Sequence, residues 1–213
     1  RVKPGITTYS ALISAFEKGA RWHEALGMFS DMMSRHVQLD AIACGAAISA
    51  CGKGAQWHDA LQLVSKMRLC CFELDIISYV AAMDACEKAA RWHDTLALFA
   101  DMRLRSVLPT SITHSMAIRA CGRSTRWQEA LGMFSELRVR RDEPDVLTYN
   151  EAVIACADSG HWLEALGLFL CMLRHRLQAD DIAYRAAATA CEEGTRWHEA
   201  LALFPSRLAT APL

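Results

Sequence analysis

The sequence predicts an all-α protein, a right-handed α-solenoid (superhelix) of about six stacked antiparallel helix pairs. Three observations predict this fold. The chain has 213 residues, and its six tryptophans, from Trp22 to Trp197, follow one another at 35-residue steps. Apolar residues around each tryptophan recur with helical spacing. The composition also favours helices, because only 11 glycines and 5 prolines interrupt the chain. A fixed period of this length is typical of proteins that grow by stacking units.

Each repeat is predicted to hold two helices, A and B. In the first repeat Tyr9, Ile13 and Phe16 follow the spacing of an amphipathic helix. A break follows near Gly19, and Trp22 begins a second apolar stripe. The predicted repeats are 6–40, 41–75, 76–110, 111–145 and 146–180, preceded by 1–5 as the tail of an earlier repeat and followed by 181–213 as a partial, capping-like repeat.

The hexapeptide RWHEAL at 21–26 recurs with small changes in every repeat, which raises the question of a catalytic or metal site. We interpret it as scaffold. Its tryptophan begins the apolar stripe of helix B and is expected to be buried, whereas the histidine and glutamate beside it should face solvent. Gln128 and Leu163 replace the histidine in two copies, and a catalytic or metal-binding role would not survive that replacement.

The nine cysteines are predicted to be free thiols in a reducing compartment. Five of them share one repeat position, where the first repeat has Phe16, so the position is one of apolar packing. A zinc site built from cysteine and histidine seven residues apart is the weaker alternative, because no CxxC pair exists. The sequence therefore predicts no metal and no cofactor. The five cysteines are Cys51, Cys86, Cys121, Cys156 and Cys191.

Charge and hydropathy indicate a soluble protein without a membrane partner. The net charge is −1, so the overall charge does not indicate nucleic-acid binding, although a local basic stripe is possible. The longest uncharged run, 106–118, is shorter than a membrane span needs. No targeting segment is visible in the chain.

The repeat resembles the pentatricopeptide repeat family, in its pure 35-residue class. A unit opens like VLTYN at 146–150, continues with EALGLF at 164–169 and closes on an aspartate. The resemblance covers 6–204. Three departures stand out: Cys44 and His114 replace the usual tyrosine at the fourth position, and Pro205 should end the last helix near Phe204.

The resemblance implies that single-stranded RNA binds along the A helices, with about one base per repeat. The second residue of each unit would then clamp bases between neighbouring repeats. The alternative is ordinary interior packing, because β-branched residues also fill cores. These residues are Thr7, Ile42, Ile77, Ile112, Leu147 and Ile182.

By the same resemblance, the fifth and last residues of a unit read the base edge. An ionised aspartate only accepts hydrogen bonds, so the registered aspartates favour uracil and guanine, whose pairing edges offer an imino N–H. The family pattern makes the fifth pair a uracil reader and the first and fourth pairs guanine readers, while the second and third should read little. The aspartates can also serve as helix N-caps, and both roles can hold together. The pairs are Ser10/Asp40, Gly45/Asp75, Val80/Thr110, Ser115/Asp145 and Asn150/Asp180, with Arg185 left unpaired.

The thirteenth residue is a cation in the first four units and an acid, Asp158 and Glu193, in the last two. Its spacing from the second and fifth positions puts it on the same face of helix A, where a row of cations suits an RNA phosphate backbone. The alternative is a solvated charge that the helix dipole favours. The cations are Lys18, Lys53, Lys88 and Arg123.

Together these patterns predict a sequence-selective RNA adaptor that leans toward G and U, has no small-molecule substrate and is not an enzyme. No nucleophile–base pair is recognised, and the zinc deaminase signature is missing from the sequence. A solenoid that binds a protein or peptide is the rival hypothesis. Family resemblance implies a mitochondrion or plastid, where such proteins serve RNA processing, stabilisation or translation.

Overall fold

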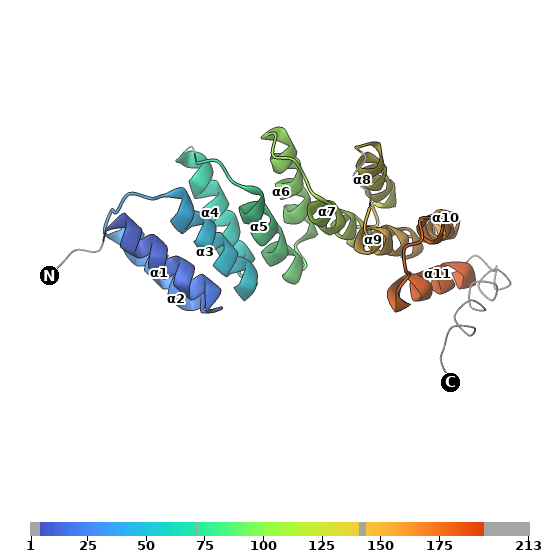
Figure 1. Cartoon of the computed structure of the whole chain (residues 1–213), viewed down its shortest axis with the longest axis horizontal. Helices are drawn as coiled ribbons and strands as arrows, with labels where there is room; N and C mark the ends of the chain where they lie inside the picture. Colours follow the sequence, from blue (N-terminus) through green and yellow to red (C-terminus); the bar gives the residue numbers. More distant parts are fainter. Residues whose placement is uncertain (1–4, 71, 141–143, 194–213) are drawn as a thin grey trace. The chain divides into compact units, whose positions relative to one another are not determined.

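The computed structural model describes residues 5–70, 72–140 and 144–193, and it describes the burial of their side chains up to residue 189. All regular structure in these ranges is α-helical, which confirms the all-α prediction (Figure 1). The predicted end of the last helix near Pro205 lies outside the described residues. The helices are α1 Ile6–Lys18, α2 Trp22–Ser34, α3 Ala41–Gly54, α4 Trp57–Leu69, α5 Ile76–Lys88, α6 Trp92–Leu104, α7 Ser111–Arg123, α8 Trp127–Val139, α9 Val146–Ala157, α10 Trp162–Arg174 and α11 Asp181–Glu193.

The helices form two compact units, Arg1–Pro109 and Thr110–Leu213. In the first unit α1 pairs with α2, α3 with α4 and α5 with α6, and the A helices α1, α3 and α5 pack side by side. In the second unit α7 pairs with α8 and α9 with α10, and α7, α9 and α11 pack side by side. Each unit is therefore a two-layer stack of helix pairs, with one layer of A helices.

The turn between helices A and B has the same backbone conformation in every described repeat. The residue two places before each tryptophan has a positive φ, between 54° and 73°, and the next amide returns to a carbonyl in the last turn of helix A. In the third repeat, for example, the Arg91 amide lies 2.8 Å from the Cys86 carbonyl oxygen. This left-handed cap ends helix A sharply and lets helix B fold back. The five residues are Ala20, Ala55, Ala90, Thr125 and Gly160.

Replacing Ala90 with glycine should stabilise the protein by about 0.5–1 kcal/mol, because an alanine Cβ is strained at a φ of 55° and glycine is not. Gly160 occupies the same place in the fifth repeat. Urea unfolding would measure the change. Ala89→Gly is the control, since Ala89 has a φ of −89° and should gain nothing. A loss of stability in Ala90→Gly would contradict the strain argument.

The recurrent cysteines lie in the core, as predicted. Cys51, Cys86, Cys121 and Cys156 have no exposed surface, and burial raises the pKa of the Cys51, Cys86 and Cys156 thiols to about 12. In the described part of the chain no three His, Cys, Asp or Glu side chains gather as a metal site would require. Cys191 lies outside the described side chains.

Cys86 should react with a thiol reagent at pH 8 far more slowly than Cys70, because Cys86 is buried and hardly ionised while Cys70 is exposed. Mass spectrometry of the modified peptides over time would measure both rates in one sample. Unfolding in urea should equalise them. Equal rates in the folded protein would show that the core opens at the Cys86 position.

The prediction that the tryptophans are buried is wrong. Trp22, Trp57, Trp92, Trp127 and Trp162 are all half-buried. Each is the first residue of a B helix, so its ring lies at the end of the helix pair, where the two helices of the pair cover it only in part.

Three of these rings touch the next repeat of the same unit, and one of the three, Trp127, stacks on the His161 ring with the ring centroids 3.7 Å apart. The Arg91 guanidinium lies 4.3 Å above the Trp57 ring, and a Cβ on Gly54 would lie 2.6 Å from the Trp22 ring. The tryptophans are scaffold at the seam between repeats, and His23, His58 and His93 face solvent as expected.

None of the helices that the structure describes is long and apolar enough to cross a membrane.

Candidate functional site

A row of exposed aliphatic side chains marks the A helices. Each is the second residue of its helix, and each side chain is between 43% and 67% exposed, which is not the burial that interior packing would produce. Thr7, the corresponding residue of α1, is exposed as well. The row is Ile42 and Ile77 in the first unit and Ile112, Leu147 and Ile182 in the second.

Beside this row, two of the predicted reader pairs are joined by hydrogen bonds. The Ser10 hydroxyl donates to Asp40 Oδ2 at 2.8 Å, and the Asn150 amide donates to Asp180 Oδ2 at 2.9 Å. In both aspartates the other oxygen, Oδ1, accepts a backbone N–H and caps the following helix, at 2.8 Å from Ala43 and 2.9 Å from Ala183. The aspartates therefore cap a helix and face the fifth residue at once.

Asn150 carries an unused acceptor. Its side chain is 3% exposed, and its carbonyl Oδ1 has no hydrogen-bond partner among the described residues. The bond from Nδ2 to Asp180 sets the orientation of the amide. A buried acceptor without a partner costs roughly 1–3 kcal/mol, so such groups are rare in native structures, and a ligand that donates a hydrogen bond would satisfy this one.

The remaining pairs differ from this pattern. Asp75 caps α5 through the Ser78 amide at 2.8 Å, but its predicted partner Gly45 has no side chain to read with. Asp145 Oδ1 accepts both the amide and the hydroxyl of Thr148. Ser115 donates to the carbonyl of Ile112 at 2.8 Å. Val80 is half-buried and Thr110 is exposed, and they belong to different units.

The cation row has a structural role that the sequence did not show. Lys53 Nζ lies 2.8 Å from the carbonyl oxygen of Glu17, and Lys88 Nζ lies 2.8 Å from that of Gly52. Glu17 and Gly52 lie at the end of the preceding A helix, where the carbonyls otherwise lack partners. Lys53 also pairs with the Glu17 carboxylate at 2.7 Å.

Each of these ammonium groups has three N–H donors, so one remains for another ligand. Lys88 places its second donor on Asp84 Oδ2 at 2.7 Å. Lys18, Arg123 and the acidic Asp158 are exposed, while the side chain of Glu193 lies outside the described residues.

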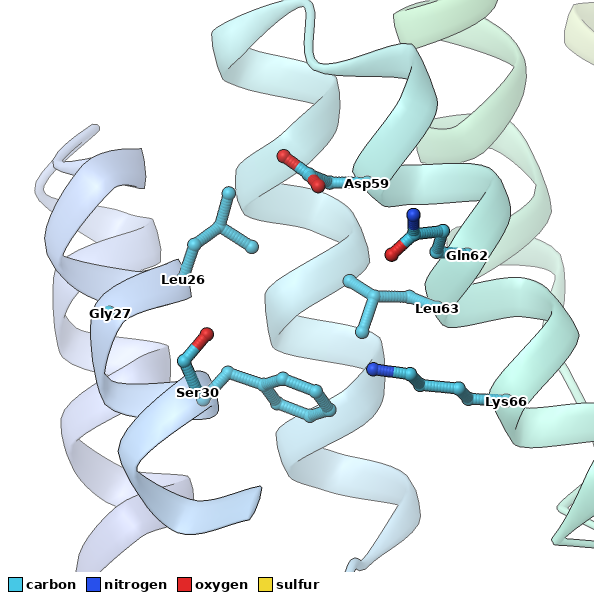
Figure 2. A pocket seen from close by; sticks show the side chains of 8 residues that line it. Leu26, Gly27, Ser30, Asp59, Gln62, Leu63 and Lys66 are labelled. Atoms are coloured by element: carbon cyan, nitrogen blue, oxygen red, sulfur yellow. The ribbon is translucent and has the colours of Figure 1, made fainter. Parts of the chain in front are cut away.

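A pocket of about 240 Å³ lies between the B helices α2 and α4 (Figure 2). Leu26, Phe29 and Leu63 form its apolar part, with Asp59 and Lys66 on α4 at its edge. No member of the aliphatic row or of the reader pairs lines it. The pocket is therefore separate from the candidate site on the A helices.

Comparisons with known proteins identify the family. The sequence model of the PPR repeat matches residues 7–37, 42–72, 112–141 and 147–177, more than half of the chain. The chain belongs to the pentatricopeptide repeat family. The third predicted repeat, 76–110, and the last, 181–213, lie outside the matched ranges. No curated protein matches the chain.

Solved structures show the same fold at low sequence identity. The pentatricopeptide repeat protein PPR10 in complex with an 18-nt psaJ RNA element is 21% identical, with a TM-score of 0.79 over the whole of this chain and 31% of that one. The PPR domain of Arabidopsis thaliana protein-only RNase P 1 in complex with tRNA is 15% identical, with a TM-score of 0.68 over 78% of this chain and 88% of that one. The chain thus spans about a third of the length of PPR10.

Proposed function

We propose that the chain binds single-stranded RNA sequence-selectively, with about one base per repeat and no catalysis of its own. The observation that carries the proposal is the exposed aliphatic row, which recurs once per repeat beside the capping aspartates. Similar folds have been solved with RNA, as PPR10 with its psaJ element and the RNase P 1 domain with tRNA.

The aliphatic row would hold the bases by their faces. Neighbouring A helices pack side by side, so consecutive row members such as Ile42 and Ile77 flank a gap of about one helix-to-helix distance, 8–10 Å. A flat base about 3.4 Å thick with an aliphatic group on either side fits such a gap, and every base has an apolar face. This part of the binding would not discriminate between bases.

The aspartates would supply the discrimination. Each carboxylate has more lone pairs than the cap and the fifth residue use, so it can accept a base N–H as well. Uracil and guanine offer such an N–H, which gives the G/U preference. Asn150 adds its unused carbonyl, so its pair with Asp180 is the strongest reader by this argument.

The remaining N–H of Lys53 and of Lys88 would contact phosphate. Replacing both lysines with glutamine should weaken binding for all RNA sequences alike, and should reduce the salt slope of log K by up to about 0.7 per lost phosphate contact. Binding measured at several salt concentrations would show it. Lys66→Gln on the B helix α4 is the matched control and should leave the slope unchanged. An unchanged slope in the double variant would leave these lysines with their helix-capping role alone.

An unbiased RNA selection with the purified chain tests the proposal as a whole. We expect guanine at the registers of the first and fourth repeats, uracil at the fifth, and no preference at the second and third. If no RNA is enriched, a protein-binding solenoid becomes the better account. We further propose a role in RNA processing, stabilisation or translation in a mitochondrion or plastid, as the family resemblance implies. Localisation of the tagged protein in cells tests that part.

A further inference from the structure

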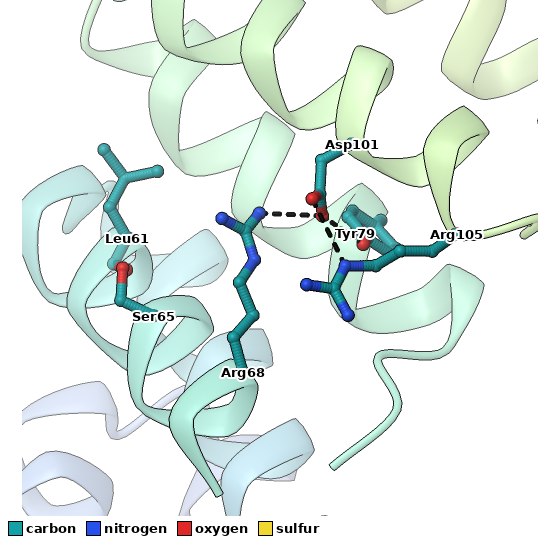
Figure 3. A network of polar contacts seen from close by, with 6 residues as sticks. All are labelled: Leu61, Ser65, Arg68, Tyr79, Asp101 and Arg105. Atoms are coloured by element: carbon teal, nitrogen blue, oxygen red, sulfur yellow. Dashed lines mark hydrogen bonds and ion pairs between the residues drawn. The ribbon is translucent and has the colours of Figure 1, made fainter. Parts of the chain in front are cut away.

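The third and fifth repeats differ at one polar cluster that joins each of them to the repeat before it. In the third repeat the Asp101 carboxylate lies at the centre of this cluster. It accepts the Tyr79 hydroxyl, pairs with Arg105 at 3.2 Å and pairs with Arg68 of the preceding repeat at 2.7 Å (Figure 3). Three donor side chains therefore hold one carboxylate.

The fifth repeat keeps the donors and replaces the carboxylate. Its tyrosine and the arginine of the preceding repeat are the same residue types, and a histidine stands for the second arginine. An imidazole still donates at least one N–H. At the central position a thiol stands for the carboxylate. The counterparts, all in the second unit, are Cys171 for Asp101, Tyr149 for Tyr79, Arg138 for Arg68 and His175 for Arg105.

The structure gathers these donors around the thiol. Tyr149 is 2% exposed, and its hydroxyl lies 3.6 Å from Cys171 Sγ, which is a weak acceptor. The centroid of the His175 ring lies 6.4 Å from that of the Tyr149 ring. Burial raises the pKa of Tyr149 to about 12, and the charge of Arg138 acts on the hydroxyl in the opposite direction. Among the described residues no carboxylate pairs with Arg138. Tyr149, Arg138 and His175 thus form an oxyanion cradle.

We propose that Cys171 is a modification site, which a hydroperoxide oxidises to a sulfinate that the oxyanion cradle holds. A sulfinate is an anion with two oxygens on the atom bonded to Cβ, as in an aspartate carboxylate. One oxygen accepts the Tyr149 hydroxyl, and the pair of oxygens takes the charged hydrogen bonds of Arg138. The oxidised fifth repeat then gains the link to its predecessor that Asp101 gives the third.

The oxidation requires two molecules of hydrogen peroxide. In each step one S–O bond forms and one O–O bond breaks, so the sulfur loses two electrons and the peroxide is reduced to water. The thiol proton leaves in the first water, and the sulfinic acid releases its proton to the solvent. Cys171 is half-buried, which leaves a path for peroxide, whereas Cys86 and Cys156 at the core position are fully buried.

Cys171→Asp tests the oxyanion cradle without any oxidation. It sets the carboxylate of the third repeat into the fifth, so its thermal midpoint should lie roughly 2–4 °C above that of Cys171→Asn, which has the same shape without the charge. The difference should vanish when Arg138→Gln is added to both variants. Equal midpoints at the outset, or a difference that survives Arg138→Gln, would overturn the proposal.

Hydrogen peroxide applied to the folded chain tests the modification itself. Mass spectrometry of the peptides would measure the fraction of each cysteine that carries two added oxygens. Cys70 is the reference in the same sample, because it is exposed and Cys44 replaces the tyrosine of its repeat. We expect at least fivefold more sulfinate at Cys171 than at Cys70, and a several-fold loss at Cys171 in Arg138→Gln. Equal sulfinate at both cysteines, or no effect of Arg138→Gln, would exclude the site.

Discussion

Replacing Asp180 with asparagine should move the base preference of the fifth repeat from uracil toward cytosine by about 1–2 kcal/mol, roughly a tenfold change in relative affinity. An ionised carboxylate can only accept, whereas an asparagine amide can also donate to the ring nitrogen of cytosine. The Asn150 amide now donates to Asp180 Oδ2, which becomes an NH2 group in the variant. We expect the Asn150 amide to flip, so that its carbonyl accepts one N–H of residue 180 and the second N–H remains for cytosine. RNA selections on the wild type and the variant, followed by binding to matched RNAs, would measure the shift.

The variant should fold as the wild type does. Asp180 Oδ1 caps α11 through the Ala183 amide, and asparagine caps a helix about as well as aspartate. Asp75→Asn is the matched control, because Asp75 caps α5 in the same way but its predicted partner, Gly45, has no side chain. It removes the same charge and should leave the base preference unchanged. If both variants shift the preference equally, or neither does, base reading by the Asn150/Asp180 pair is refuted.

Replacing Asp101 with alanine should lower the free energy of unfolding by about 2 kcal/mol. Asp101 Oδ2 accepts the Tyr79 hydroxyl and pairs with Arg68 at 2.7 Å, and Oδ1 pairs with Arg105 at 3.2 Å (Figure 3). Arg68 comes from the preceding repeat, so the carboxylate links α4 to α5 and α6. The loss stays below the 3–5 kcal/mol of a fully buried pair because the Asp101 side chain is 19% exposed.

Asp31→Ala is the comparison that isolates the link between repeats. Asp31 has the same place in the first repeat and accepts Tyr9 at 2.6 Å and Arg35 at 2.9 Å, both of its own repeat. Urea unfolding should show a clearly smaller loss for Asp31→Ala than for Asp101→Ala. Equal losses would mean that the bond between Arg68 and Asp101 contributes nothing.

The same carboxylate predicts a pH dependence. Burial by itself would raise the pKa of Asp101, but the Tyr79 hydrogen bond and the two arginines outweigh it and hold the pKa below its usual value. A group whose pKa is lower in the folded protein contributes stability above its unfolded pKa, near 4. That contribution should disappear as the pH falls from about 4 through the folded pKa. Wild type and Asp101→Ala should therefore converge in stability at acidic pH.

The sequence alone was sufficient to predict the repeat of helix pairs and to predict which repeat positions are buried and which cap a helix. A 35-residue step with helical spacing predicts the helix pairs, and a position that takes cysteine or phenylalanine predicts the buried thiols that the structure contains. The capping role of Asp40 and Asp180 was also predictable, because an aspartate before an apolar helix is a common N-cap. These features depend on local spacing and on residue chemistry, which the sequence carries directly.

Only the tertiary structure decided which contacts the residues at the helix ends make with the neighbouring repeat. Trp57 looked like a core residue, yet its ring lies half-exposed under Arg91 of the next repeat. Lys53 and Lys88 were predicted to contact phosphate, with a solvated helix charge as the alternative, and the sequence did not show that each also donates to a carbonyl at the end of the preceding A helix. An apolar periodicity tells which side of a helix is covered, but how far the cover extends depends on the neighbouring repeat. Contacts between repeats join residues about 35 positions apart, so the spacing of residues within one repeat does not predict them.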